Sequence, residues 1–164
     1  MDINKIFEEA INDPTLLSTI DIEKLLETLE NEKNDYLENK TIEKITKEIY
    51  KKINELDIEK EKKINYCEKL NEYRLVNEIC ELHKGKHIKW IKLSNKQLIG
   101  GGIVVNIKFM DNGTQVLVKN QMNHFIQIKF DDCLIFQKMT LQEQLILMAY
   151  EYLEKGEAYP LTNP

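Results

Sequence analysis

Residues 102–119 read GIVVNIKFMDNGTQVLVK, the clearest β-hairpin pattern in the chain. Apolar residues recur at every second position of its first arm, a pattern that predicts a half-buried strand. The side chains expected to point inward are Ile103, Val105, Ile107 and Phe109. Asp111-Asn112-Gly113 predicts a tight hairpin, because Asn and Gly tolerate positive φ. The return arm at 114–119 is then expected to bury Val116 and Val118.

Three further strands are predicted around this hairpin, at 87–93, 124–130 and 134–138. Five short antiparallel strands within about 50 residues are typical of a small barrel of the SH3-like or OB-like kind. A helix is predicted to pack on the barrel, because Thr140-Leu141-Gln142-Glu143 has the pattern of a capping box. Gly156 marks the expected end of that helix.

The chain before Gly85 predicts helices instead. Apolar residues at helical spacing predict one helix at 3–11, a second at 21–38, and a third from Thr41 to Gly85. The third begins with an aliphatic seam made of Ile42, Ile45, Ile49, Ile53 and Leu56. Steps of three and four residues are typical of a coiled coil. The seam fits two arrangements equally, a helical hairpin within one chain and a coiled coil between chains.

Together these patterns predict an α+β protein with two domains. Residues 1–84 are expected to form a helical region, and residues 85–164 a small five-stranded antiparallel barrel with a closing helix. Charge follows the same division. Residues 1–83 carry 13 Lys and Arg against 21 Asp and Glu, whereas residues 84–138 carry 9 Lys and 3 Asp. A basic module between acidic helices is expected to dock on a partner.

The basic barrel also suggests a nucleic-acid face, because single-strand binders combine positive grooves with stacking aromatics. The residues expected on that face are Lys89, Lys92, Lys108, Lys129, Phe125 and Trp90. Two other interpretations remain open. Strand lysines also protect sheet edges as solvated side chains, and Trp90 lies between Ile88 and Ile91, where a core position is equally consistent.

No residue set in the sequence specifies a reaction. Cys80 and His83 have the spacing of a metal-ligand pair, but no second pair completes a four-ligand zinc site. Cys133 and His124 are the residue types of a nucleophile and its base, without an oxyanion or orienting signature beside them. We therefore expect no catalytic site, no cofactor and no bound metal.

The sequence also bounds the compartment. MDINKIFEEA lacks the apolar core of a secretory signal, and no segment approaches the roughly 20 apolar residues of a membrane-spanning helix. Three scattered cysteines, Cys67, Cys80 and Cys133, are expected as reduced thiols. We expect a cytoplasmic protein with no membrane partner.

Three segments carry a resemblance to a known family: RLVNEICELHKGKHIKWI (74–91), GGGIVVNI (100–107) and FIQIKFDDCLIFQKMTLQEQLIL (125–147). They resemble an uncharacterised protein family of the nucleocytoplasmic large DNA viruses, the giant viruses. The resemblance covers the C-terminal half only and carries no catalytic motif. It implies a viral origin, with the host cytoplasm or the virion as the location.

The sequence thus predicts a non-enzymatic interaction or assembly protein, of a virion or a replication factory if it is viral. Its expected partner is another protein or a second copy of itself, bound through the helical seam. The alternative is a nucleic-acid-binding module that uses the basic barrel.

Overall fold

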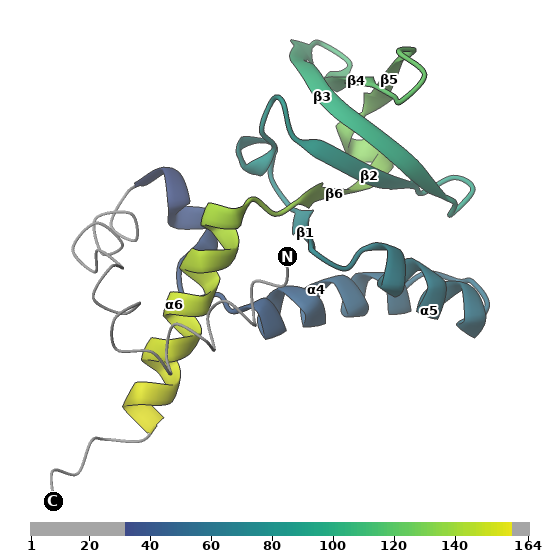
Figure 1. Ribbon diagram of the computed structural model, residues 1–164. Coiled ribbons are helices and arrows are strands. Elements are labelled where there is room, and N and C mark those ends of the chain that lie inside the picture. Colours follow the sequence, from purple (N-terminus) through teal and green to yellow (C-terminus); the bar gives the residue numbers. More distant parts are fainter. Residues whose placement is uncertain (1–31, 159–164) are drawn as a thin grey trace, which may run out of the picture. The chain divides into compact units, whose positions relative to one another are not determined.

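The structure, a computed structural model, describes residues 32–158 of the chain (Figure 1). The predicted helix at 3–11 and most of that at 21–38 lie outside the described residues. Contacts divide the chain into two units, Met1–Glu38 and Asn39–Pro164, which we describe separately. In the first unit, the described element is the 3-10 helix η1 (Glu32–Leu37). The other described elements belong to the second unit, whereas the sequence predicts a boundary at residues 84 and 85.

Helix α4 (Ile42–Asn54) begins where the sequence predicts a new helix. The side-chain oxygen of Thr41 accepts a hydrogen bond from the Lys44 amide at 3.2 Å and caps the helix. Its buried residues, Ile45, Ile49 and Ile53, recur every four positions and share one face. Helix α5 (Lys60–Lys69) follows after a short turn and buries Tyr66.

The prediction that this helical region runs on to Gly85 is wrong beyond α5. Tyr73–Val76 form strand β1, and Ile79–Glu81 form the 3-10 helix η2. All residues of β1 are buried, since the strand pairs with β6 and contacts α4. Sheet pairing gives this apolar run both backbone hydrogen bonds and burial, which outweighs a weak helical periodicity.

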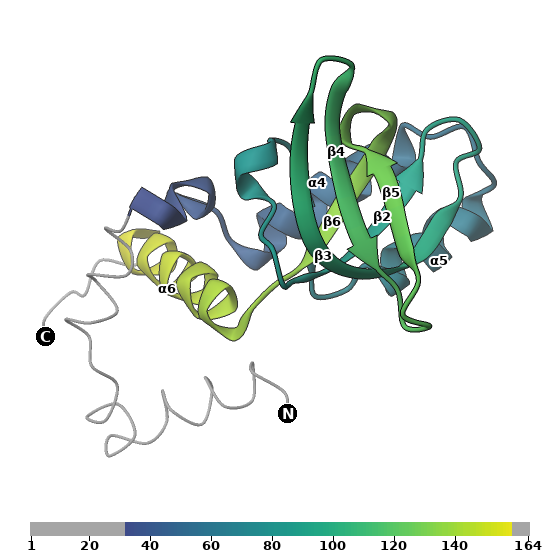
Figure 2. The same ribbon diagram turned by 90° about the horizontal axis from the view of Figure 1, so that it is seen from above.

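The described residues contain a sheet of six antiparallel strands rather than the predicted five, because β1 joins it. The others are β2 (His87–Lys92), β3 (Leu98–Met110), β4 (Gly113–Lys119), β5 (Phe125–Lys129) and β6 (Cys133–Lys138). The order β1-β6-β2-β3-β4-β5 leaves β1 and β5 as edges, so the sheet is open. Figure 1 shows β1 next to α4, with β3, β4 and β5 farther from this helix, and Figure 2 shows β3, β4 and β5 side by side.

The hairpin of β3 and β4 forms where it is predicted, but the burial of β3 is reversed at residues 103–105. Val104 is 1% exposed, whereas Ile103 is 48% and Val105 is 41% exposed. The pairing register shifts between Val104 and Asn106, so Val105 is an extra residue that interrupts the alternation. The prediction that Ile103 and Val105 point inward is therefore wrong, whereas Ile107 packs against the core as predicted. Phe109, near the tip of the hairpin, is 75% exposed rather than buried.

One core cluster lies on the inner face of the curved sheet. Its buried members are Val76, Leu82, Ile88, Trp90, Val104, Val116, Val118, Ile128 and Ile135. Close approach of β2, β3 and β4 beside this cluster depends on glycine. A Cβ at Gly102 would lie 2.5 Å from the Lys119 carbonyl oxygen, so no larger residue fits.

Helix α6 (Leu141–Ala158) begins at the predicted capping box, which is confirmed. The Thr140 hydroxyl accepts from the Glu143 amide, and the Glu143 carboxylate accepts from the Thr140 amide, both at 3.1 Å. The second carboxylate oxygen of Glu143 pairs with Arg74 of β1. Helix α6 also contacts α4. The start of α6 is thus tied to the sheet by a charged side chain.

Candidate interaction surface

Side chains on one face of β3, β4 and β5 lie in cross-strand rows, and they are exposed except for Gln115, which is 8% exposed. One row holds Ile103, Lys119 and Phe125. Another row holds Lys108, Gln115 and Lys129. Val116 and Ile128, one position further along their strands, are buried in the core. Because neighbouring strand positions point to opposite sides, both rows lie on the outer side of the sheet.

We call this surface the basic face. Its members are Ile103, Val105, Lys108, Gln115, Lys119, Phe125, Gln127 and Lys129. Its three strands contain three lysines and not one aspartate or glutamate. The lysines are all exposed, and Phe125 is 61% exposed. A surface that mixes uncompensated positive charge with apolar area favours an acidic partner.

Two contacts order the basic face. The Lys119 ammonium lies 5.9 Å from the centre of the Phe125 ring, a cation–π contact between β4 and β5. The Gln127 side-chain amide donates to the Gln115 side-chain oxygen at 3.2 Å. The second contact crosses the same pair of strands in the middle of the face. These side chains are therefore held in place before any partner arrives.

Lys108, Lys129 and Phe125 are the members of the predicted nucleic-acid face that the structure brings together. Lys89 lies apart from them, beside α5. Its ammonium donates to the Lys69 carbonyl oxygen at 3.0 Å and lies 4.9 Å from the centre of the Tyr73 ring. Burial, with the nearby positive charges of Lys69 and Lys138, lowers the pKa of Lys89. Lys89 is therefore engaged within the chain.

Trp90 and Lys92 also depart from the predicted face. Trp90 is 1% exposed and belongs to the core cluster, so it has no surface on which a base could stack. Lys92 is exposed and pairs in register with Cys133 at the end of β2. It lines a groove of about 510 Å³ together with Leu93, Ser94, the β5 residues Gln127–Lys129, and Asp131–Cys133.

The sequence-based set omits Lys119 and the exposed aliphatics Ile103 and Val105. Strict alternation through β3 predicts the two aliphatics in the core. Pairing the predicted hairpin around Gly113 puts Lys119 near Ile103. The register of the hairpin could therefore have placed Lys119 on this face. No local signal marks Val105 as the extra residue.

The predicted helical seam lies inside the chain. Ile45, Ile49, Ile53 and Leu56 are buried, and Ile42 is half-buried. Helix α4 contacts α5, β1 and α6, so the seam packs within one copy. This placement favours the internal arrangement over an intermolecular coiled coil.

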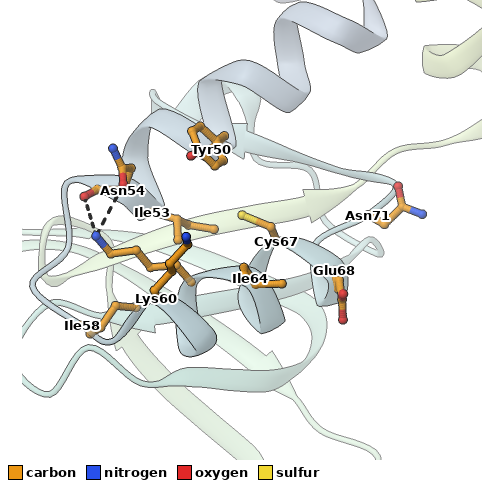
Figure 3. A pocket seen from close by; sticks show the side chains of 10 residues that line it. Tyr50, Ile53, Asn54, Ile58, Lys60, Ile64, Cys67, Glu68 and Asn71 are labelled. Carbon is orange, nitrogen blue, oxygen red and sulfur yellow. Dashed lines mark hydrogen bonds between the residues drawn. The ribbon is translucent and has the colours of Figure 1, made fainter.

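A groove of about 910 Å³ lies between α4 and α5. Figure 3 shows Tyr50, Ile53, Ile64 and Cys67 around it. Lys63 also lines the groove, and its ammonium donates to the Asn54 carbonyl oxygen at 3.0 Å. The lining of the groove mixes apolar side chains with Lys60, Lys63 and Glu68, without a cluster of reactive groups. None of the residues of the basic face lines it.

The candidate nucleophile and its base lie at opposite ends of β5. His124 is exposed in the turn before this five-residue strand, and Cys133 follows η3 (Phe130–Asp132) after it. A strand of that length separates its ends by roughly 17 Å. Burial, followed by the charge of Asp132, raises the pKa of the Cys133 thiol. The arrangement does not activate Cys133 as a nucleophile.

Cys80 and His83 have separate partners. The Cys80 thiol is exposed and lies 3.7 Å from a carboxylate oxygen of Glu78. The His83 amide donates to the Gln137 side-chain oxygen at 2.8 Å. Between residues 32 and 158, no three His, Cys, Asp or Glu side chains converge in a way that could hold a metal ion.

No protein-family model, curated protein or solved structure matches this chain. Among the helices that the structure describes, none has both the length and the hydropathy needed to cross a membrane.

Proposed function

We propose that this protein is a non-enzymatic interaction module whose basic face binds an acidic protein partner. The observation that carries the proposal is the composition of that face. Lys108, Lys119 and Lys129 lie on three adjacent strands that have no acidic residue, beside the exposed ring of Phe125. Opposite charge steers association, and the apolar side chains supply area for burial.

This proposal moves the partner surface from the helices to the sheet, because the seam is buried within the chain. We also propose that the strands form a module of the SH3-like kind, the first of the two barrel types that the sequence predicts. Strands β2, β3, β4 and β5 follow one another as a meander, and β6 returns to pair with β2. The module is left open along β5. A giant-virus virion or replication factory is the setting that the family resemblance suggests.

The second candidate function is binding of single-stranded nucleic acid by the same face. The contact of Lys119 with the exposed Phe125 ring favours it, since bases stack on aromatics beside cationic side chains. Three lysines on one face would neutralise about three phosphates, which predicts a shallow salt dependence of about 2 log units of affinity per log unit of salt.

The two functions separate in one titration series. Binding is measured for a deca-glutamate peptide and for a ten-nucleotide oligo-dT. The test variant is Lys108→Glu/Lys119→Glu/Lys129→Glu. The control, Lys51→Glu/Lys62→Glu/Lys84→Glu, changes the net charge equally at exposed positions away from the sheet face. If the basic face binds an acidic protein, the wild type should bind the peptide. The test variant should then lose at least tenfold in affinity for the peptide, and the control variant less than threefold.

Equal losses in both triple variants would show that only net charge matters, and would overturn the proposal. Binding of oligo-dT without binding of the peptide would replace the first function with the second. In that case Phe125→Ala should weaken binding of the oligonucleotide by about 1–3 kcal/mol.

A further inference from the structure

Strand β5 has one free edge. It pairs with β4 alone among the described residues, and it ends the strand order of the sheet. The Asn120 amide donates to the His124 carbonyl oxygen at 2.9 Å, which fixes the phase of the ladder. In an antiparallel pair, the backbone groups of successive residues point alternately toward and away from the partner. The groups of Ile126 and Ile128 therefore face β4, and those of Phe125, Gln127 and Lys129 face away.

A groove runs beside this edge. Gln127, Ile128 and Lys129 line it from β5, and Lys92, Leu93 and Ser94 line it from the end of β2 and the turn after it. Its volume of about 510 Å³ exceeds that of a few side chains. Leu93 is 44% exposed, which adds apolar surface to the groove. The free edge thus adjoins open space that an extended chain can enter.

We propose that the acidic partner binds as an added β-strand along β5, in a segment that alternates acidic and apolar residues. The inference rests on the proposed function and names its binding mode. The outward groups of β5 supply three amide donors and three carbonyl acceptors to such a strand. Its side chains on the outer side would lie beside Phe125, Gln127 and Lys129, where the positive charge of Lys129 favours a carboxylate. Its alternate side chains would point into the groove beside Ile128.

The charges of the groove itself refine this partner. Lys92 and Lys129 are offset by Asp131 and Asp132, which lie where β5 leads into η3. The groove is therefore close to neutral, and the preference for acid comes from the sheet face. Acidic side chains of the added strand belong on the outer side, while apolar ones belong in the groove.

Proline at residue 127 tests the backbone contact directly. Gln127→Pro removes one outward amide, and edge strands tolerate proline where the lost N–H faces solvent. Gln127→Thr is the matched control, because it also loses the side-chain bond to Gln115 but keeps the backbone amide. The probe is a nine-residue peptide alternating Glu and Val, with blocked ends. We expect Gln127→Pro to lose at least tenfold in affinity and Gln127→Thr to lose less than threefold.

Amide exchange of the wild-type complex supplies a second measurement that does not depend on the proline variant folding. The amides of Phe125, Gln127 and Lys129 should exchange at least tenfold more slowly with the peptide bound. If they remain unprotected, or if folded Gln127→Pro binds like the wild type, strand addition is wrong. If the lysine triple variant still loses binding in that case, the proposed function survives without it. Binding of oligo-dT but not of the peptide would overturn both.

Discussion

Arg74 and Glu143 form a buried ion pair that joins β1 to the first turn of α6. The Arg74 Nε atom donates to a Glu143 carboxylate oxygen at 2.6 Å, and the two side chains are 3% and 5% exposed. Arg74 is the single arginine in the chain. A second nitrogen of its guanidinium donates to the Glu81 carbonyl oxygen at 2.6 Å. This planar fork serves two acceptors at fixed angles, which a lysine cannot do.

Removing one partner of this pair should destabilise the fold strongly. Arg74→Met leaves the Glu143 carboxylate buried without its counter-charge, at an expected cost of about 3–5 kcal/mol in the free energy of unfolding. Urea unfolding, followed by fluorescence, measures that loss. Arg74→Met/Glu143→Gln should recover most of the stability, because it removes both charges from the interior and keeps a side-chain oxygen for the Thr140 amide. A double variant no more stable than Arg74→Met would contradict this assignment.

Two half-buried histidines should make stability depend on pH. Burial, then the charge of Arg74, lowers the pKa of His83, and burial with Lys89 and Lys138 lowers that of His87. Both histidines therefore stay neutral in the folded state at pH values where the unfolded chain, with a pKa of about 6.5, already takes up protons. Stability should fall as pH drops from about 6.5 toward the lowered values.

The variant His83→Gln/His87→Gln isolates that contribution. Its free energy of unfolding, measured at pH 7.5 and at pH 5.5, should change less between the two than that of the wild type. An equal or larger change in the variant would mean that the histidines do not carry the dependence. Carboxylates titrate in the wild type and in the variant alike, so the difference between the two proteins excludes the effect of the carboxylates.

Trp90 and Phe125 should respond oppositely to truncation. Trp90→Ala opens a cavity in the core and should cost about 3–5 kcal/mol of stability. Phe125→Ala removes an exposed ring and should change stability by about 0.5–1 kcal/mol, while it weakens partner binding. Thermal unfolding of the two variants checks this order. Similar losses in both would place Phe125 in the core and remove it from the basic face.

The three thiols should react at different rates with a thiol reagent. Cys80 is exposed and should react first in the folded protein at pH 7.5. Burial raises the pKa of Cys67 and of Cys133, so both hold less thiolate and should react at least tenfold more slowly. In urea all three should react at similar rates. Faster labelling of Cys133 than of Cys80 would point to an activated thiol and reopen an enzymatic function.

Local signals explain which parts of the fold the sequence predicted well. The turn at Gly113 and the capping box at Thr140 depend on residues within four positions of each other, so their patterns are specific. Strand β1 depends on pairing with β6, more than 50 residues later, and its residues also fit a helical stripe. The error there came from a long-range contact that no local pattern carries.

The candidate surface was half predictable for a similar reason. Lys108, Lys129 and Phe125 follow from alternation within strands that the sequence located correctly. Lys89 and Trp90 lie on β2, where helix packing covers one side and the core covers the other. The sequence of β2 alone does not show that a helix packs on one side of the strand and the core on the other. The extra residue at Val105 reversed the exposure of its neighbours, and that change of phase appears only in the paired register.

The proposed function requires that the outer side of β3, β4 and β5 binds an acidic partner. A nitrogen-15 NMR titration of the wild-type chain with the deca-glutamate peptide locates that binding residue by residue. We expect amide shift changes concentrated in residues 103–129, largest near Lys119 and Lys129, and suppressed by added salt. Shift changes confined to the groove between α4 and α5, or their absence at millimolar peptide, would contradict it.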